Sequence, residues 1–338
     1  MSQLPYEYNI NVPALSSVFS RTTNSYKFLF FQALLSLFKS SHFKKDTFTF
    51  DELEEEIIEI ARHPINVFKL NFGTQDKISE NIQGKSTNLM KYVPYRLLTP
   101  FFANQLSGME DGDKNKMIEK LSNENRQFNS VYKIIGNKVE LYVEWAEYLK
   151  SHYAIIESWV FWHWVNYLQG KNPNAIALVN KLQKPSVRAS LSHQKKYWKT
   201  VLNHTELHCI FSKKPITKQD ISLDHFLPWS FIGHDQLWNL IPVSKSVNSS
   251  KSDNIPSMDK YLDKFVNMQL LGLEVSHKNM SKRVWENQVD DFVLGLNVDF
   301  PDLLNQNEII VRNYREIVPP LANVAHNMGF NADWVFNQ

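Results

Sequence analysis

Apolar residues recur at helical spacing along most of the chain, which predicts a protein built mainly from α-helices. In residues 26–39 they occupy most of the helix circumference, so this helix should be buried nearly all round. Thr49 and Glu52 form a capping-box pattern, which opens a helix expected to stop at Pro64. Residues 144–168 predict one long aromatic helix. The first half of the chain should therefore be mainly helical.

Two regions have β-type patterns instead. Residues 131–135 and 138–143 flank a Gly136-Asn137 turn and predict a hairpin. A second pair of β-type runs ends near Asp224 and begins at Asn239, and a short helix should follow from Lys245. Further helices are expected near 175–183, 190–202, 258–271, 281–294 and 311–328. The predicted fold class is α+β and predominantly α-helical.

Composition is that of a folded globular protein. The 338 residues are 43% hydrophobic, and this length favours about two domains. No apolar stretch reaches the roughly 20 residues that a spanning helix needs, so no membrane contact is expected. The N-terminus lacks the pattern of a signal peptide, and Cys209 is the single cysteine. Together these features predict a reducing, cytoplasmic setting.

Charge is balanced overall but positive locally. The formal net charge of +2 does not by itself indicate nucleic-acid binding. Between Arg188 and Asp253, however, nine Lys and Arg residues outnumber five acidic residues. Phosphate binding requires such a local excess. We expect four lysines of this segment to contact nucleic acid: Lys195, Lys199, Lys245 and Lys251.

The same segment holds side chains suited to phosphodiester hydrolysis: Asp224-His225, Asn239 and Asn248. Hydrolysis near neutral pH needs a base that activates water and a cation that neutralises charge on the phosphate. Histidine is a natural base because its ordinary pKa is about 6.5, so His225 is the candidate. Asp224 and Asn248 offer the oxygen ligands that suit Mg²⁺.

The order of Asp224 and His225 imposes a geometric condition. Neighbours on an ideal strand point to opposite faces, so both can serve one site only if the strand bends or ends there. Pro228 supports such a break. Asn239 can then hydrogen-bond to the backbone that carries His225 and orient it. Asn248 should lie in the first turn of the short helix, aimed back at the strands.

At these residues the sequence resembles the HNH, or ββα-metal, endonuclease family. Asp224-His225, Asn239 and Asn248 match the family's Asp-His, middle Asn and final Asn. Their separations of 14 and 9 residues are similar to those of the HNH domain in RNA-guided CRISPR nucleases. The resemblance implies that His225 is the general base, that Asn239 holds its loop, and that Asp224 and Asn248 bind Mg²⁺ or Mn²⁺.

The chain is expected to divide into three regions. Residues 1–184 would form a helical N-terminal domain, a candidate module for DNA or partner recognition. Residues 185–256 would form the HNH nuclease module, with its core motif at 209–253. Residues 257–338 would form a helical C-terminal region that packs on the nuclease module. Pro185 and the change in charge place the first boundary.

The sequence departs from the family at one point. Many HNH domains carry Cys-x-x-Cys knuckles that bind structural zinc, whereas here only Cys209 is present, so no structural zinc is expected. His204 and His208 have the spacing of a zinc protease, but Glu206 between them points away, and a protease is not expected. His234, in the loop between the strands, is a candidate for approach to substrate.

We therefore expect a Mg²⁺- or Mn²⁺-dependent HNH endonuclease that cuts DNA in bacterial anti-phage defence or restriction. Two alternatives stay open: an RNA-cleaving HNH nuclease, and a catalytically silent subunit that binds nucleic acid or acts as a scaffold. Candidate partners are an ATPase or sensor protein of a defence system and a second copy of the chain.

Overall fold

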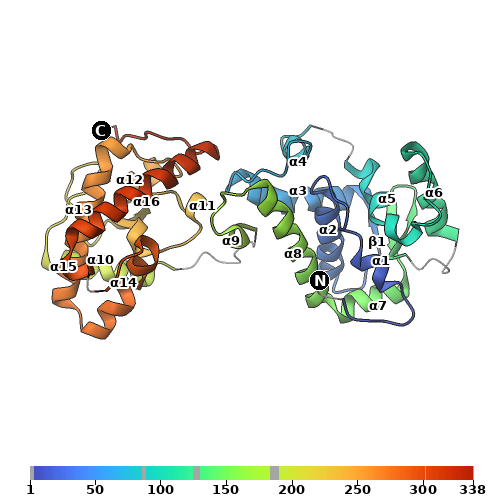
Figure 1. Ribbon diagram of the computed structural model, residues 1–338, viewed down its shortest axis with the longest axis horizontal. Helices are drawn as coiled ribbons and strands as arrows, with labels where there is room; N and C mark the ends of the chain where they lie inside the picture. The colour runs from blue at the N-terminus through green and yellow to red at the C-terminus, as the bar shows by residue number, and fades with distance from the viewer. Residues whose placement is uncertain (1–3, 86–88, 125–129, 183–189, 301, 338) are drawn as a thin grey trace. The chain divides into compact units, whose positions relative to one another are not determined.

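The computed structural model describes residues 4–85, 89–124, 130–182, 190–300 and 302–337. The chain divides into two compact units, Met1–Pro173 and Asn174–Gln338. The described residues are mostly helical and contain two small sheets, which confirms the predicted class (Figure 1). The boundary expected at Pro185 lies outside the described residues. No described helix is long and apolar enough to cross a bilayer.

The N-terminal unit is centred on helix α2 (Tyr26–Ser40), which contacts α3 (Phe50–Asn66) and α8 (Tyr153–Lys171). Apolar side chains are buried on all sides of α2, as its sequence predicts, including the run Phe28, Leu29, Phe30 and Phe31. The capping box of Thr49 and Glu52 opens α3. A helix buried on all sides in this way organises the core of the unit.

A three-stranded antiparallel sheet lies in the same unit, in the order β1 (Thr47–Thr49), β3 (Lys138–Leu141), β2 (Tyr132–Ile135). The predicted hairpin is confirmed, and Gly136 adopts the positive φ of 59° that its turn requires. The unit also contains α1 (Val12–Ser16), α4 (Ile78–Ile82), η1 (Leu89–Lys91), α5 (Val93–Leu97), η2 (Thr99–Phe102), α6 (Asp111–Glu124) and α7 (Val143–Ser151).

Two helix ends differ from the prediction. Helix α3 continues through Pro64 to Asn66, because a proline in the last turn removes only one hydrogen bond of the helix. The predicted single aromatic helix is two helices, α7 and α8, which are interrupted at His152. The backbone of His152, with φ −112° and ψ 21°, has left the helical region. No proline or glycine marks that break in the sequence.

The C-terminal unit contains an antiparallel hairpin, β4 (Ile221–His225) and β5 (Leu240–Ser244), followed by α12 (Lys245–Lys251). The register pairs Ile221 with Ser244 and His225 with Leu240. The unit also contains α9 (Leu178–Leu182), α10 (Ser192–His204), α11 (Trp229–Ile232), η3 (Leu237–Asn239), α13 (Met258–Asn279), α14 (Lys282–Leu296), α15 (Asp302–Asn305) and α16 (Asn307–Asn327).

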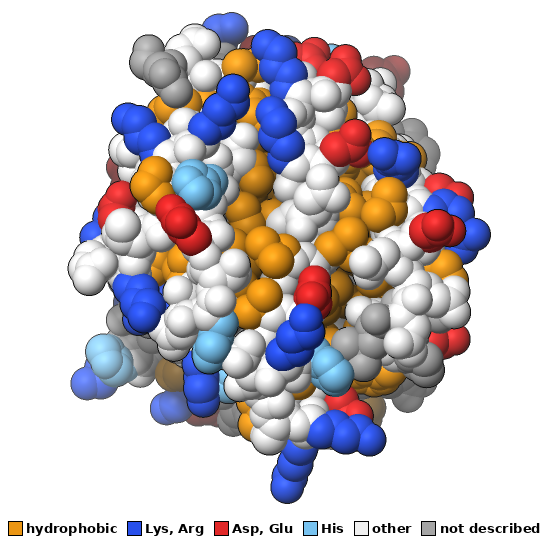
Figure 2. All heavy atoms as spheres, turned by 90° about the vertical axis from the view of Figure 1, so that its left-hand side faces the viewer, with side chains coloured by type: hydrophobic (Ala, Val, Ile, Leu, Met, Phe, Trp, Pro, Cys, Tyr) orange, Lys and Arg blue, Asp and Glu red, His pale blue; other side chains and the backbone are white. Residues whose placement is uncertain are grey.

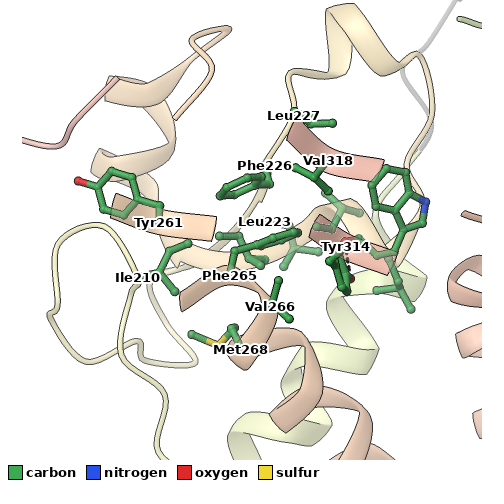
Figure 3. Close-up of a cluster of buried hydrophobic side chains, with 14 of the residues drawn as sticks. Ile210, Leu223, Phe226, Leu227, Tyr261, Phe265, Val266, Met268, Tyr314 and Val318 are labelled. Carbon is green, nitrogen blue, oxygen red and sulfur yellow. Dashed lines mark hydrogen bonds between the residues drawn. The ribbon is translucent and has the colours of Figure 1, made fainter. Parts of the chain in front are cut away.

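The hairpin and the C-terminal helices share one hydrophobic core. Figure 3 shows Leu223, Phe226 and Leu227, from β4 and the turn after it, beside side chains of α13 and α16. Phe226 stacks on Phe265 of α13 with ring centroids 4.0 Å apart, and Phe265 meets Tyr314 of α16 edge-on. Burial on this scale is the main stabilising contribution, so the hairpin depends on helices far along the chain.

The C-terminal helices also bind the backbone at the start of β5. The fully buried Gln269 donates through Nε2 to the carbonyl oxygens of Leu237, Trp238 and Leu240, at 3.0–3.2 Å. The hydroxyl of Tyr314 donates to the carbonyl oxygen of Trp238 at 2.9 Å. Helices α13 and α16 therefore fix the strand that carries the second half of the predicted site.

The segment around Cys209 forms a tight turn. The amide of Cys209 donates to the carbonyl oxygen of Lys214, and the amide of Lys213 donates to that of Cys209, both at 2.8 Å. Phe211 in this turn packs against Tyr261 and against Trp334 near the C-terminus. Aromatic packing and backbone hydrogen bonds thus hold the turn that contains Cys209.

Candidate active site

The predicted break in the first strand occurs where Asp224 and His225 lie. Strand β4 ends at His225, and the amide of Phe226 still donates to the carbonyl oxygen of Asn239 at 2.8 Å. Pro228 then caps the short helix α11, so the chain turns away from the sheet. Asp224 and His225 are thus the last two residues of the strand.

Asn239 holds the loop that follows His225. This residue is fully buried, its Oδ1 accepts from the amide of Leu227 at 2.8 Å, and its Nδ2 donates to the Leu227 carbonyl oxygen at 2.9 Å. One side chain therefore satisfies both polar groups of a backbone unit two residues beyond His225. Because both the amide and the carbonyl of Leu227 are bound, the segment that follows the imidazole has little freedom.

Asp224 faces helix α12 on one side of the hairpin. Its carboxylate is 3% exposed and forms an ion pair with the fully buried Lys251, whose Nζ lies 3.2 Å from Oδ2. Lys251 Nζ also donates to the carbonyl oxygen of His225 at 2.6 Å. Burial raises the pKa of Asp224, and the charges of Lys251 and His225 oppose that rise. The ammonium of Lys251 therefore pairs with this carboxylate in a buried position.

Asn248 projects from the first turn of α12 toward the same strand. Its Nδ2 donates to the hydroxyl of Ser222 at 2.8 Å and to the carbonyl oxygen of Leu223 at 3.4 Å. Ser222 and Asp224 are two positions apart and share one face of β4. The amide nitrogen of Asn248 is thus bound to the strand that carries Asp224.

His225 points to a different neighbour, Asp235 in the loop before β5. His225 Nε2 lies 2.9 Å from Asp235 Oδ1, and the side chains are 7% and 18% exposed. Gln194 at the start of α10 donates to the carbonyl oxygen of Asp235 at 2.9 Å. The sequence reasoning missed both Asp235 and Gln194, because their contact with the site depends on the path of a loop.

A comparison with protein families finds a match, which covers the segment that contains this site. Residues 209–257 match the family model described as HNH endonuclease. This segment belongs to the HNH endonuclease family. The match begins at the Cys209 turn and runs through β4, β5 and α12 to Ser257, so it contains Asp224, His225, Asn239 and Asn248. No curated protein and no solved structure matches the chain.

Of the four lysines expected to bind nucleic acid, three are exposed and one is buried. Lys195, Lys199 and Lys245 are exposed. The prediction for Lys251 is corrected, because this lysine is fully buried and its ammonium is held by Asp224 and the His225 carbonyl oxygen. The face shown in Figure 2 carries both basic and acidic side chains, with several basic ones near its upper edge.

Three other histidines of this region, His204, His208 and His234, make contacts of their own. His204 ends α10, whereas His208 lies beyond it and pairs with Glu206 at 3.7 Å, so the two do not share a helix face. His234 is half-buried against Trp238. Burial first, and then the neighbouring charge of His225, lower the pKa of His234 to about 4. His234 is therefore neutral at pH 7.

The residues at the HNH site fit a divalent cation bound through oxygen. Oδ2 of Asp224 is buried and makes no hydrogen bond with a described residue, although the ammonium of Lys251 is near. No three His, Cys, Asp or Glu residues of the described chain gather into a metal-binding group. A cation here would take the carboxylate of Asp224, the amide oxygen of Asn248 and water. One or two protein ligands plus several waters is the set that Mg²⁺ usually takes.

Proposed function

We propose that the protein is a metal-dependent endonuclease that hydrolyses DNA phosphodiester bonds at the HNH site. One observation carries the proposal. At the end of a single strand, the buried carboxylate of Asp224 has one oxygen that makes no hydrogen bond with any described residue. It is followed directly by His225, whose loop is fixed by Asn239. A base and a metal ligand held beside each other are the parts that this reaction needs.

The proposed roles follow from the contacts of each residue. His225 takes a proton from water as the water oxygen forms its bond to phosphorus and the bond to the leaving oxygen breaks. Asn239 keeps the loop of His225 in place. Asp224 and Asn248 would hold Mg²⁺ or Mn²⁺, and the bound ion would supply positive charge to the phosphate oxygens and the leaving group. Lys195, Lys199 and Lys245 offer exposed ammonium groups to the nucleic-acid backbone.

The biological setting forms part of the same proposal and rests on resemblance. Because the chain resembles HNH nucleases of bacterial restriction and phage defence, the proposed role is DNA cleavage in such a defence system, in the cytoplasm. The proposed partner is an ATPase or sensor protein of that system, or a second copy of the chain. The exposed lysines would attract the phosphates of either DNA or RNA. Matched DNA and RNA substrates therefore decide between the proposed activity and its RNA-cleaving alternative.

The test compares His225→Ala with His208→Ala, which alters an exposed histidine of the same segment. With Mg²⁺ or Mn²⁺ present, His225→Ala should cut at least about 100-fold more slowly than the unaltered protein, because a general base typically contributes 10²–10⁴-fold. His208→Ala should cut at the normal rate. EDTA should stop cutting, and added Mn²⁺ should restore it. Unchanged cutting by His225→Ala, or cutting without metal, would reject the proposal.

A further inference from the structure

We propose that Asp235 is a positioning residue that fixes the His225 ring so that Nδ1 is the nitrogen that accepts a proton from water. The inference rests on the proposed nuclease function for the identity of the reaction. Its geometric basis is independent of that function: His225 Nε2 lies 2.9 Å from Asp235 Oδ1. A carboxylate only accepts hydrogen bonds, so the proton of the neutral imidazole must sit on Nε2.

The other ring nitrogen is the one left for chemistry. No described residue makes a hydrogen bond to His225 Nδ1, whereas Nε2 is committed to Asp235. With the proton on Nε2, the lone pair of the neutral ring lies on Nδ1. When Nδ1 accepts a proton the ring becomes positively charged, and the adjacent carboxylate of Asp235 stabilises that charge. Asp235 thus sets both the orientation and the tautomer of His225.

The loop that carries Asp235 is fixed at several points, as a positioning device requires. Gln194 of α10 donates to the Asp235 carbonyl oxygen at 2.9 Å. Two residues further on, the amide of Leu237 donates to Asp291 Oδ2 of α14 at 2.9 Å. Gly233 begins the loop with a φ of +75°, and a Cβ there would lie 3.1 Å from Ala177. Hydrogen bonds from α10 and α14 therefore hold the backbone of the loop that carries the carboxylate.

The central experiment measures the tautomer of His225 directly, in the full-length protein. Imidazole ¹⁵N chemical shifts distinguish Nε2–H from Nδ1–H, and a His225→Gln spectrum assigns this ring among the 11 histidines. We expect Nε2–H in the unaltered protein. Asp235→Asn can donate from its amide to Nε2, so this variant should populate Nδ1–H. The matched control Asp220→Asn, at an exposed acidic residue before β4, should leave the tautomer unchanged.

Cleavage is measured in parallel. If Nδ1 is the base, Asp235→Asn should cut DNA about 100-fold more slowly with little change in DNA affinity, because the wrong nitrogen would be protonated. Gln194→Ala, which touches only the loop backbone, should lower the rate by about 3- to 10-fold and tests the same idea if Asp235→Asn fails to fold. Asp220→Asn should cut normally.

The outcomes separate the inference from the proposed function. Nδ1–H in the unaltered protein overturns the positioning role. An Asp235→Asn variant that keeps Nε2–H and cuts within about threefold of normal also overturns it. If the unaltered protein cuts neither DNA nor RNA but His225 changes tautomer in Asp235→Asn, the proposed function fails and the positioning role stands.

Discussion

Lys181, on α9, is a lysine without exposed surface near the candidate site. Its Nζ donates to the carbonyl oxygen of Phe231 at 2.5 Å and lies 5.5 Å from the centroid of the Phe231 ring. Burial lowers the pKa of Lys181 from 10.5 to about 8. In the unfolded chain the pKa returns to about 10.4. Below pH 8 both states are protonated, and the folded state carries the full cost of the buried charge.

This difference predicts how stability varies with pH. As pH rises from about 8 to about 10.5, folded Lys181 loses its proton first and the cost is relieved, so the lysine becomes less destabilising. Lys181→Met cannot titrate. The unaltered protein should therefore gain up to about 3 kcal/mol in free energy of unfolding between pH 7 and pH 10.5 that Lys181→Met does not gain. Urea unfolding at several pH values measures this, and the exposed Lys196→Met should give a constant difference.

At the scale of single residues, the sequence predicted contacts between residues whose spacing along the motif indicates that they lie close together. It missed contacts that form only because a folded loop brings a residue to the site. Asn239 was expected to bond to the backbone beyond His225, and it does so through Leu227. Asp235 was missed because only the folded loop brings it to the imidazole. Lys251 was expected at the surface, yet it lies one helical turn beyond Asn248 and shares that residue's inward face. The three-residue spacing between Asn248 and Lys251 in a helix could have predicted that both face inward.

At the scale of elements, the sequence predicted where helices occur better than it predicted their first and last residues. Apolar periodicity located α2, α10, α13, α14 and α16, because each buries one or more faces in a core. The helix predicted at 258–271 extends to Asn279, and the one predicted to start at 311 starts at Asn307. The extra turns carry polar residues on exposed faces, and tertiary packing on the remaining face stabilises them.

Helix α14 contains a position where the fold requires glycine. A Cβ at Gly295 would lie 2.0 Å from Nε1 of Trp238, which donates to Gln236 beside Asp235. Gly295→Ala should therefore displace Trp238, lower the free energy of unfolding by about 1–3 kcal/mol and slow cleavage. Gly170→Ala is the matched control, because no atom lies within 4 Å of its added Cβ in α8.

Gly170→Ala should instead stabilise the protein by about 0.5–1 kcal/mol, since alanine is the better helix former. Thermal and urea unfolding measure both changes. Equal effects of the two substitutions would show that helix propensity, and not the contact with Trp238, determines the result. Cleavage kinetics then report whether movement of Trp238 reaches the loop of Asp235.

At the scale of the whole molecule, packing defines where the C-terminal unit begins. The compact unit begins at Asn174, and the boundary that Pro185 and the change in charge predict lies outside the described residues. Residues 174–182 belong to that unit because α9 buries Leu178, Lys181 and Leu182. A proline reports a local break in the chain, but a unit is defined by which side chains share a core.

That distinction predicts which fragments fold. The match to the HNH family ends at Ser257, but the hairpin shares its core with Phe265 and Tyr314, and Gln269 binds the backbone of η3 and β5. A fragment of residues 174–338 should therefore unfold in one cooperative transition. A fragment of residues 174–257 should show none, because it leaves Phe226 and Leu240 exposed and the carbonyl groups unpaired. Circular dichroism during thermal unfolding measures both.

Cleavage by the fragment of residues 174–338 then tests whether the C-terminal unit is sufficient for the reaction. The C-terminal unit contains every residue assigned to the reaction, so residues 174–338 should cut with the same metal requirement as the full chain. If the N-terminal unit recognises DNA or a partner, its removal should raise KM and leave kcat nearly unchanged, because uniform binding is lost and the reacting groups stay in place. A fragment that folds, binds metal and yet has a kcat reduced about 100-fold would show that the N-terminal unit contributes to the reaction itself.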